Sequence, residues 1–316
     1  MDGAKRLLCV GSGWIASKLT AHATEACRWP CHVAYQNFRN TAIAPEQMVQ
    51  LPRTREGFAN LLQELKPDYI VYALGSGFVF DIEANLGKAI EDNVVTLAHV
   101  CEAAASMGAP IKKLLVVGSA SIYEPSESAL GEDAAIAPIE NYGMLKAVQE
   151  RVALSFHERH GLPVVVARQF NTSGIGQNRR FVLPSIANQV AETLRGGHSG
   201  LKLRLGDTSA KRDFLAVTDT VAAYVTLLEH AAAGSVYNVC SGATHSVADL
   251  AQRACRLFGL EVEFDVQSNL VRKGEHRRPV LLGSCERLRS LGWEPHISLD
   301  SLIREMVEAE LAVNTR

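Results

Sequence analysis

The stretch Arg6-Leu7-Leu8-Cys9-Val10-Gly11-Ser12-Gly13-Trp14-Ile15-Ala16 decides the fold of this chain of 316 residues. Its largely apolar first half predicts a buried parallel strand, and a helical pattern begins at Ser17. Glycines at 11 and 13 permit a tight turn and let the backbone approach a diphosphate, while a small residue at 16 lets the helix pack on the strand. Taken alone, the segment could be an ordinary strand-to-helix turn. We predict a dinucleotide-binding turn with cofactor contacts from Gly11, Gly13, Trp14, Ile15 and Ala16.

Short apolar runs recur after this stretch, each separated from the next by enough chain for a helix. We expect further strands at His32 to Tyr35, Tyr69 to Leu74, Leu114 to Val117 and Pro163 to Ala167. This alternation predicts an α/β fold, namely a Rossmann-type doubly wound parallel sheet whose ligands bind at the carboxyl ends of the strands. The residues at those ends should line one crevice, and they are Gly11, Gly75, Ser119 and Arg168.

Beyond Asn171 the pattern becomes irregular, with glycines flanking one helical stretch from Leu183 to Leu194. We therefore expect a dinucleotide-binding domain of residues 1–171 and 213–240. A smaller, discontinuous C-terminal lobe of residues 172–212 and 241–316 would bind the substrate.

Composition excludes several classes of protein. Hydrophobic residues make up 47% of the chain, charged residues 21%, and the formal net charge is −2. These values are typical of a soluble globule and argue against nucleic acid as the main partner. No apolar stretch reaches the ~20 residues of a membrane helix, and the start of the chain leads directly into the first expected strand. The seven cysteines contain no Cys-x-x-Cys and the histidines do not cluster, so we expect a cytoplasmic protein without a metal site.

Tyr142 and Lys146 form a Tyr-x-x-x-Lys pair, and Ser119 precedes them at the end of an apolar run. On a helix this spacing places both side chains on one face one turn apart. The ammonium would then favour the phenolate form of a phenol that otherwise titrates near ~10. Any amphipathic helix can carry Tyr and Lys at this spacing by chance, but together with the glycine turn the pair predicts proton transfer at a carbonyl or alcohol.

These motifs, in their order along the chain, resemble those of the extended short-chain dehydrogenase/reductases that act on nucleotide-diphosphate sugars, the NAD-dependent epimerase/dehydratase family. Within that family the chain is most similar to GDP-4-keto-6-deoxy-mannose reductases. The resemblance covers nearly the whole sequence. It is carried by Gly11 to Ala16, Ser119 to Tyr123, Tyr142 to Lys146, Arg168 to Asn171, Gly206-Asp207, Arg212 to Leu215, Val236 to Gly242 and Leu291 to Pro295.

The resemblance implies a role for each residue of the trio. Tyr142 would donate a proton to the C4 carbonyl of the sugar. Lys146 would favour the phenolate and hold the nicotinamide ribose, and Ser119 would hydrogen-bond the same carbonyl oxygen. Further cofactor contacts would come from Ala73, Leu74, Gly75 and Gln169.

The second expected strand is followed by Gln36-Asn37-Phe38-Arg39, which offers no carboxylate for a ribose 2′-hydroxyl. Arg39 could instead bind a 2′-phosphate, so NADP(H) is favoured over NAD(H). The alternative is that Arg39 is a solvated loop residue. A second departure from the family is a glycine turn that is one residue shorter than usual, with Ala16 at the third glycine position.

For the substrate, the resemblance implies that Arg272 binds the diphosphate, helped by Asn171, and that Arg212 contacts the nucleotide. Ser76, Ser119, Ala120 and Ser121 would lie at the sugar, and Arg180 and Val182 near the base. Surface arginines are common, so a solvated role is favoured for Arg179, Arg180, Arg277 and Arg278. Glu150 is compatible with a helical ion pair to Lys146, and Tyr123 and Trp293 are expected in the core.

The related 4,6-dehydratases carry an acidic pair after the catalytic Ser or Thr, whereas this chain has Ala120 and Ser121. We therefore expect no dehydration, and reduction of a GDP-linked 4-keto-6-deoxy sugar is the leading hypothesis. A nucleotide-sugar 4-epimerase with tightly bound NAD is the alternative, and a non-catalytic dinucleotide-sensing protein is a third. The resemblance also implies a homodimer formed through the helix of Tyr142 and the segment Glu91 to Ala105.

Overall fold

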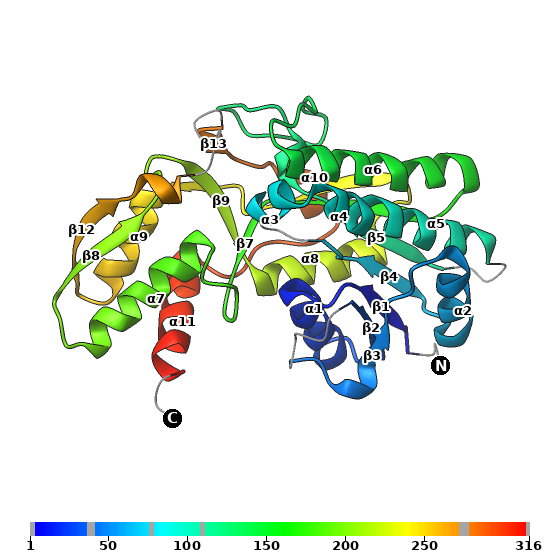
Figure 1. Ribbon diagram of the computed structural model, residues 1–316, viewed down its shortest axis with the longest axis horizontal. Helices are drawn as coiled ribbons and strands as arrows, with labels where there is room; N and C mark the ends of the chain where they lie inside the picture. The colour runs from blue at the N-terminus through cyan, green and yellow to red at the C-terminus, as the bar shows by residue number, and fades with distance from the viewer. Residues whose placement is uncertain (1–3, 37–41, 76–78, 108–110, 272–277, 314–316) are drawn as a thin grey trace.

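The structure is a computed structural model that describes residues 4–36, 42–75, 79–107, 111–271 and 278–313 (Figure 1). At its centre lies a seven-stranded sheet in the order β10-β6-β5-β4-β1-β2-β3, and all neighbouring strands run parallel. The strands are β1 (Leu7–Val10), β2 (Cys31–Tyr35), β3 (Met48–Gln50), β4 (Tyr69–Tyr72), β5 (Lys113–Val117), β6 (Val164–Gln169) and β10 (Ser235–Val239).

Helices cover both faces of this sheet. One face carries α1 (Trp14–Glu25) and α8 (Val217–His230), and the other carries α2 (Arg55–Leu65), α5 (Thr96–Ser106) and α6 (Asn141–His160) (Figure 1). Every residue of β1 and β4 is buried because a parallel sheet between two helical layers has no solvent face. The predicted Rossmann-type fold is confirmed. The three-residue edge strand β3 was not predicted, since it is only partly buried and has no apolar run.

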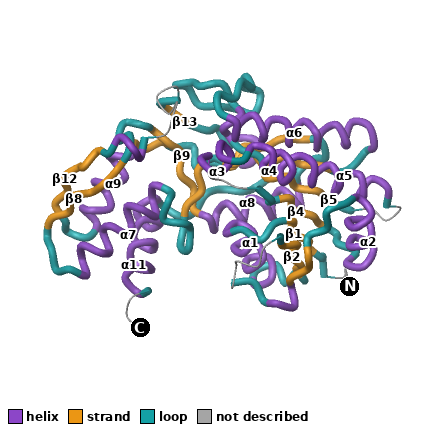
Figure 2. Tube along the Cα trace, in the orientation of Figure 1, coloured by secondary structure: helices purple, strands orange, loops and turns teal. Residues whose placement is uncertain are grey.

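The smaller lobe has its own apolar core around Val190, Leu203, Leu250 and Ile303. Its elements are α7 (Val182–Arg195), β8 (Gly200–Leu205), α9 (Val247–Leu257), β12 (Glu261–Val266) and α11 (Leu299–Ala312) (Figure 2). Helix α7 confirms the stretch expected from Leu183 to Leu194. Helices α9 and α11 were not predicted, although serines cap both, and Ser246 forms a capping box with Asp249. The domain boundaries stay a prediction.

A small sheet lies between the two parts of the molecule. Its strands are β7 (Asn171–Ser173), β9 (Lys211–Ala216), β11 (Thr244–Ser246) and β13 (Val280–Leu281). Asp213 of β9 is fully buried, and its carboxylate accepts hydrogen bonds from the amides of Ser241 and Gly242 at 2.8 and 3.0 Å. Burial raises the pKa of Asp213, while these donors oppose the rise. The carboxylate therefore fastens β9 to the turn that follows β10.

The remaining helical segments are short. They are α3 (Val79–Ala84), α4 (Leu86–Ile90), α10 (Glu286–Arg289), the 3₁₀ turns Pro45–Gln47, Ala120–Ile122 and Ser268–Leu270, and a π-helical turn, Glu91–Val95, that joins α4 to α5. No helix among the described residues is both long and apolar enough to cross a membrane.

Arg168 was expected in the crevice at the strand ends, and this expectation is wrong. Its side chain is buried, and its guanidinium pairs with Glu150 at 2.6 and 2.9 Å and donates to the hydroxyl of Tyr123 at 2.9 Å. Successive side chains of a strand point to opposite faces, so Gln169 of β6 lines the cavity instead. The helical ion pair with which the Lys146–Glu150 spacing is compatible does not form, because the Glu150 carboxylate pairs with Arg168.

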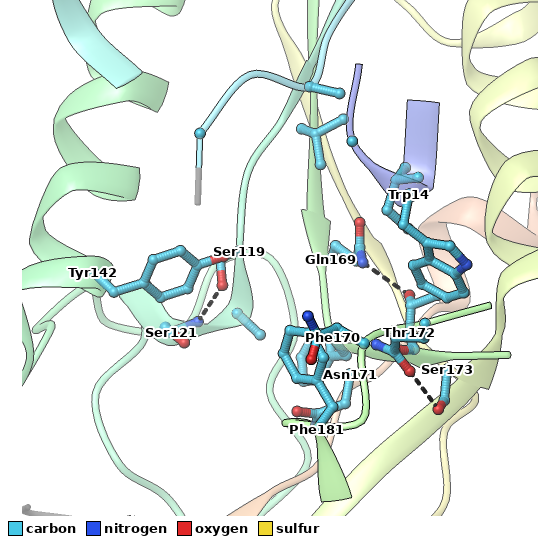
Figure 3. A pocket seen from close by; sticks show the side chains of 18 of the residues that line it. Trp14, Ser119, Ser121, Tyr142, Gln169, Phe170, Asn171, Thr172, Ser173 and Phe181 are labelled. Atoms are coloured by element: carbon cyan, nitrogen blue, oxygen red, sulfur yellow. Dashed lines mark hydrogen bonds between the residues drawn. The ribbon is translucent and has the colours of Figure 1, made fainter. Parts of the chain in front are cut away.

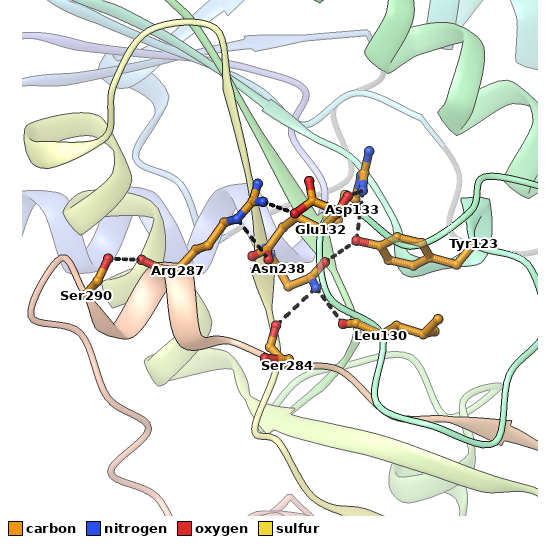
Figure 4. A network of polar contacts seen from close by, with 9 residues as sticks. Tyr123, Leu130, Glu132, Asp133, Asn238, Ser284, Arg287 and Ser290 are labelled. Carbon is orange, nitrogen blue, oxygen red and sulfur yellow. Dashed lines mark hydrogen bonds and ion pairs between the residues drawn. The ribbon is translucent and has the colours of Figure 1, made fainter.

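Tyr123 continues this network away from the active site (Figure 4). Its hydroxyl donates to the side-chain oxygen of Asn238 at 2.6 Å. The backbone N–H of Asn238 donates to the carboxylate of Glu132 at 2.8 Å. Arg287 closes the chain of contacts through Glu132 and Asp133. Both Tyr123 and Trp293 are buried, as expected of core residues.

Candidate active site

The strand ends of the large sheet and the small sheet enclose a cavity of about 720 Å³. In the close-up, Tyr142 and Ser119 lie on one side, Trp14 and Gln169 on the other, and Phe170, Asn171 and Phe181 between them (Figure 3). Most of the predicted cofactor residues line this cavity. Three of the predicted substrate residues, which follow Ser119 or β6 in the sequence, line it as well. The first group is Gly13, Trp14, Ile15, Ala16, Ala73, Leu74, Gly75 and Gln169, and the second is Ala120, Ser121 and Asn171.

The glycine turn after β1 fits a dinucleotide. Gly11 has a φ of +111°, and a Cβ there would lie 2.9 Å from backbone atoms of Ala73 and Leu74, so a larger residue would push the turn away from β4. A Cβ at Gly13 would meet nothing within 4 Å, so this residue leaves its side of the cavity open. Gly13 is also the N-cap of α1, whose first amides face the opening. This arrangement suits a bound diphosphate.

Gly75, at the end of β4, is a second close approach. Its φ is +124°, and a Cβ would lie 2.5 Å from the side-chain oxygen of Asn93 in the π-helical turn. The side chain of Asn93 is buried and donates to the carbonyl of Ala89 at 2.9 Å. The backbone at Gly75 is thus held at the cavity wall by a side chain that itself has no room to move.

Ser119 and Tyr142 come from separate elements and meet at the cavity. Ser119 caps the 3₁₀ turn Ala120–Ile122, and its hydroxyl oxygen accepts from the Ser121 amide at 3.1 Å. Tyr142 is the second residue of α6, and its phenol points toward Ser119 (Figure 3). The hydroxyl of Ser119 can still donate, because the Ser121 bond uses only an oxygen lone pair.

Lys146 lies one turn along α6 from Tyr142 and is buried. Its ammonium donates to the Val117 carbonyl at 3.0 Å and to the Gln149 side-chain oxygen at 2.8 Å. Burial lowers the pKa of Lys146 to about 8, because removal from water disfavours the charged form. The ammonium keeps one further N–H for a ligand.

Gln169 and Trp14 bound the other side of the cavity. Gln169 donates to the Thr172 hydroxyl at 2.9 Å and accepts a hydrogen bond from Tyr224, whose pKa is raised by burial. The indole N–H of Trp14 donates to the carbonyl of Ile175 at 3.0 Å. Trp14 therefore ties the glycine turn to the loop that leads into α7.

Two of the predicted substrate-binding arginines, Arg180 and Arg212, lie among the described residues, and both make contacts outside this cavity. Arg180 pairs with Asp81 at 3.2 Å at the surface, and Arg212 donates to the carbonyls of Lys211 and Pro279. Neither lines the cavity, whereas Val182 does. Arg179 is half exposed and pairs with Glu310, as expected of a surface arginine. Arg39, Ser76, Arg272 and Arg277 lie outside the described residues.

Arg278 is the arginine for which the surface assignment is wrong. It is 8% exposed, and it donates to the carbonyls of Ser121 and Tyr123. Several cavity residues also escaped the sequence analysis, namely Glu140, Phe170, Asn178, Phe181, Phe214 and Leu281. Glu140 could have been found, since it stands two residues before Tyr142. The apolar residues carry no local signal that separates them from core residues.

Among the described residues, no group of three or more His, Cys, Asp or Glu side chains could hold a metal ion. The cavity brings together a serine, a tyrosine and a lysine beside a glycine turn that fits a dinucleotide. A fold of this type with this trio defines an NAD(P)-dependent enzyme of the short-chain dehydrogenase/reductase class.

Comparison with known proteins supports this class and identifies a family within it. The profile of the family described as GDP-mannose 4,6 dehydratase matches residues 53–306, and the chain belongs to this family. The chain is 30% identical to the GDP-6-deoxy-D-mannose reductase of Pseudomonas aeruginosa, over 80% of this chain and 83% of that protein.

Solved structures show the same fold. RMD from Pseudomonas aeruginosa complexed with NADPH matches with a TM-score of 0.81 and 26% identity, over 98% of this chain and 100% of that one. The Thermus thermophilus UDP-glucose 4-epimerase in complex with NAD matches with a TM-score of 0.83 and 20% identity, over 96% of this chain and 98% of that one. The second likeness concerns the fold alone.

Proposed function

We propose that this protein reduces the C4 carbonyl of a nucleotide-diphosphate 4-keto-6-deoxy sugar that is GDP-linked, with NADPH as the reductant. The observation that carries the proposal is the meeting of Ser119, Tyr142 and Lys146 in the cavity bounded by the glycine turn. The similarity to a GDP-6-deoxy-D-mannose reductase supports the choice of sugar and base.

The residues divide the work at the carbonyl. Tyr142 gives its phenolic proton to the carbonyl oxygen as this oxygen gains negative charge, and Ser119 donates a hydrogen bond to the same oxygen. The ammonium of Lys146 stabilises the phenolate that Tyr142 leaves behind and binds the nicotinamide ribose. The nicotinamide, when bound in reduced form, supplies the hydride. The protein's contribution is geometry and charge.

The preference for NADPH is supported by the NADPH complex of RMD, to which this chain is similar over almost its whole length. On this chain the preference depends on Arg39, whose role stays a prediction. Initial rates with NADPH and NADH test it, and equal kcat/KM values for the two cofactors would remove the role given to Arg39.

Dehydration is not proposed, although the family carries a dehydratase's name. The turn after Ser119 brings Ala120 and Ser121 to the cavity, and neither side chain can act as a carboxylic acid or base. We expect GDP-mannose with oxidised cofactor to give no 4-keto-6-deoxy product. Formation of that product would overturn the exclusion.

A substrate panel tests the function directly. GDP-, dTDP-, UDP- and CDP-linked 4-keto-6-deoxy sugars are incubated with NADPH, and the products are identified by NMR. Stoichiometric NADPH oxidation with the GDP-linked sugar, giving a C4 alcohol, is the expected result. Purified protein that carries tightly bound NAD and interconverts C4 epimers without consuming added NADPH would establish the epimerase instead.

A further inference from the structure

Arg278 is a buried arginine that precedes β13, and its side chain reaches the turn that carries Ser119. Its guanidinium donates to the carbonyl of Ser121 at 3.1 Å and to the carbonyl of Tyr123 at 2.8 Å. One Nη2 atom makes both bonds, so the guanidinium bridges the middle and the end of the turn. Because Ser121 lines the cavity and Tyr123 is fully buried, the contact lies at the boundary of the active site.

The same turn is held from its other side by the catalytic helix. A Cβ at Gly143 would lie 2.3 Å from the carbonyl oxygen of Ser121, so this carbonyl rests directly on the backbone of α6 next to Tyr142. The Ser121 amide, in turn, donates to the hydroxyl of Ser119. Ser121 is thus fixed at its carbonyl by Arg278 and Gly143, and its amide holds the hydroxyl of Ser119.

Removing the Arg278 guanidinium from water costs free energy that its contribution to folding does not by itself explain. Desolvation lowers its pKa, which the negative charge of Glu140 partly opposes. Among the described residues, the buried Nε atom has no hydrogen-bond partner. Two backbone carbonyls could be satisfied by a smaller neutral donor at less desolvation cost. The burial of a long charged side chain between β13 and this turn is better explained by the position in which it holds the turn.

We infer that Arg278 is a positioning residue, which fixes the Ser119–Tyr123 turn from the second lobe so that the Ser119 hydroxyl and the Tyr142 phenol address one carbonyl oxygen. This inference deepens the proposed function and rests on it for its catalytic consequence. Hydride and proton transfer to one carbonyl require both donors in place together, and a shift of about 1 Å can lower the rate about 100-fold. Arg278 itself touches no reacting atom in this scheme.

The test compares Arg278→Ala, Arg278→Lys and the matched control Arg253→Ala. Arg253 is an arginine of the same lobe that pairs with Asp300 at 2.7 Å on the surface. For each variant we would measure kcat, the KM of the 4-keto sugar, the Kd of NADPH by fluorescence, and amide hydrogen exchange in the segment 119–123. Guanidinium ion at millimolar concentration is added to the variants to replace the lost group.

We expect Arg278→Ala to lower kcat about 10- to 100-fold, with a change in NADPH Kd below about 2-fold. Amide hydrogen exchange should rise in residues 119–123 but not in β5. Added guanidinium ion should restore part of kcat. The control variant Arg253→Ala should behave as the wild type. Arg278→Lys, which keeps a donor, should be intermediate. It also carries the test if the alanine variant does not fold.

Wild-type kcat in Arg278→Lys with a folded but unrescued alanine variant would overturn the inference. A loss of NADPH affinity in parallel with kcat, or unchanged exchange in 119–123, would do the same, since either marks a general structural role. If the wild type reduces no sugar in the panel, the proposed function fails at that step. The exchange measurement needs no substrate and still decides whether Arg278 holds the turn.

Discussion

Lys146 shows how the surroundings of a single residue set its chemistry. Its ammonium is buried and donates to Val117 and Gln149, and its pKa falls from the usual 10.5 to about 8. The charged form is therefore complete well below pH 8 and is lost as the pH rises through 8. We predict that kcat/KM for the cofactor, which reports ionisations of the free enzyme, declines above about pH 8. A rate profile that stays level to pH 10 would remove the charge of Lys146 from the mechanism.

Tyr142 provides a second prediction at the residue scale. Tyr142→Phe removes the proton donor but leaves the ring at the cavity wall, so turnover should fall by at least about 100-fold. The Kd for the dinucleotide should stay within about 2-fold, since the glycine turn and Lys146 are intact. Steady-state rates and NADPH fluorescence titration measure the two effects. Retained turnover would take Tyr142 out of the proton-donor role.

At the scale of elements, α6 is anchored to the sheet by the buried Arg168–Glu150 pair. Arg168→Met leaves the Glu150 carboxylate buried without its partner and should lower the free energy of unfolding by ~3–5 kcal/mol. The double variant Arg168→Met/Glu150→Leu should recover most of this loss, because no charge is then left unpaired. Urea denaturation followed by circular dichroism measures both.

The chain offers a matched control on the same helix. Arg151 pairs with Glu158 at 2.7 Å, but the side chains are 67% and 50% exposed. Arg151→Met should change the stability little, because solvent screens an exposed pair. An equal loss for Arg168→Met and Arg151→Met would mean that the buried pair does not anchor α6.

At the scale of the whole molecule, helix α6 lies beside α5 and the π-helical turn that precedes it (Figure 1). Four apolar side chains here are between 39% and 43% exposed, namely Ile90 of α4, Val95 of the π-helical turn, and Met144 and Val148 of α6. Together with the family resemblance, this surface leads us to predict a homodimer with two-fold symmetry. Sedimentation equilibrium should give twice the mass of the chain, and Met144→Glu/Val148→Glu should give the monomer.

Val266→Glu is the control for this prediction, because Val266 is 57% exposed in the second lobe, away from α5 and α6. It should leave the dimer intact. A wild-type protein that sediments as a monomer at micromolar concentration would refute the homodimer.

Features that depend on residues close together in the chain could be predicted from the sequence, and features that depend on distant residues could not. Glycine turns, apolar strands and the Tyr142–Lys146 spacing are local patterns, and the structure places them as expected. Arg168 and Arg278 were misassigned because their partners are 18 and 157 residues away. No local pattern distinguishes a buried arginine from a solvated one. Arg39, Ser76 and Arg272, which lie outside the described residues, stay predictions.

The class of this protein follows from local patterns in its amino-acid sequence. The strand and glycine turn at residues 6–16, the alternation after it and the Ser119, Tyr142 and Lys146 motif follow from short-range sterics, burial and spacing, which every chain with these residues must obey. Tertiary structure alone decided how these parts are held. In the folded chain Lys146 is buried and its pKa is lowered, Glu150 pairs with Arg168, and Arg278 contacts the turn that carries Ser119. Burial and pairing depend on which distant segments meet, and only the folded chain brings those segments together.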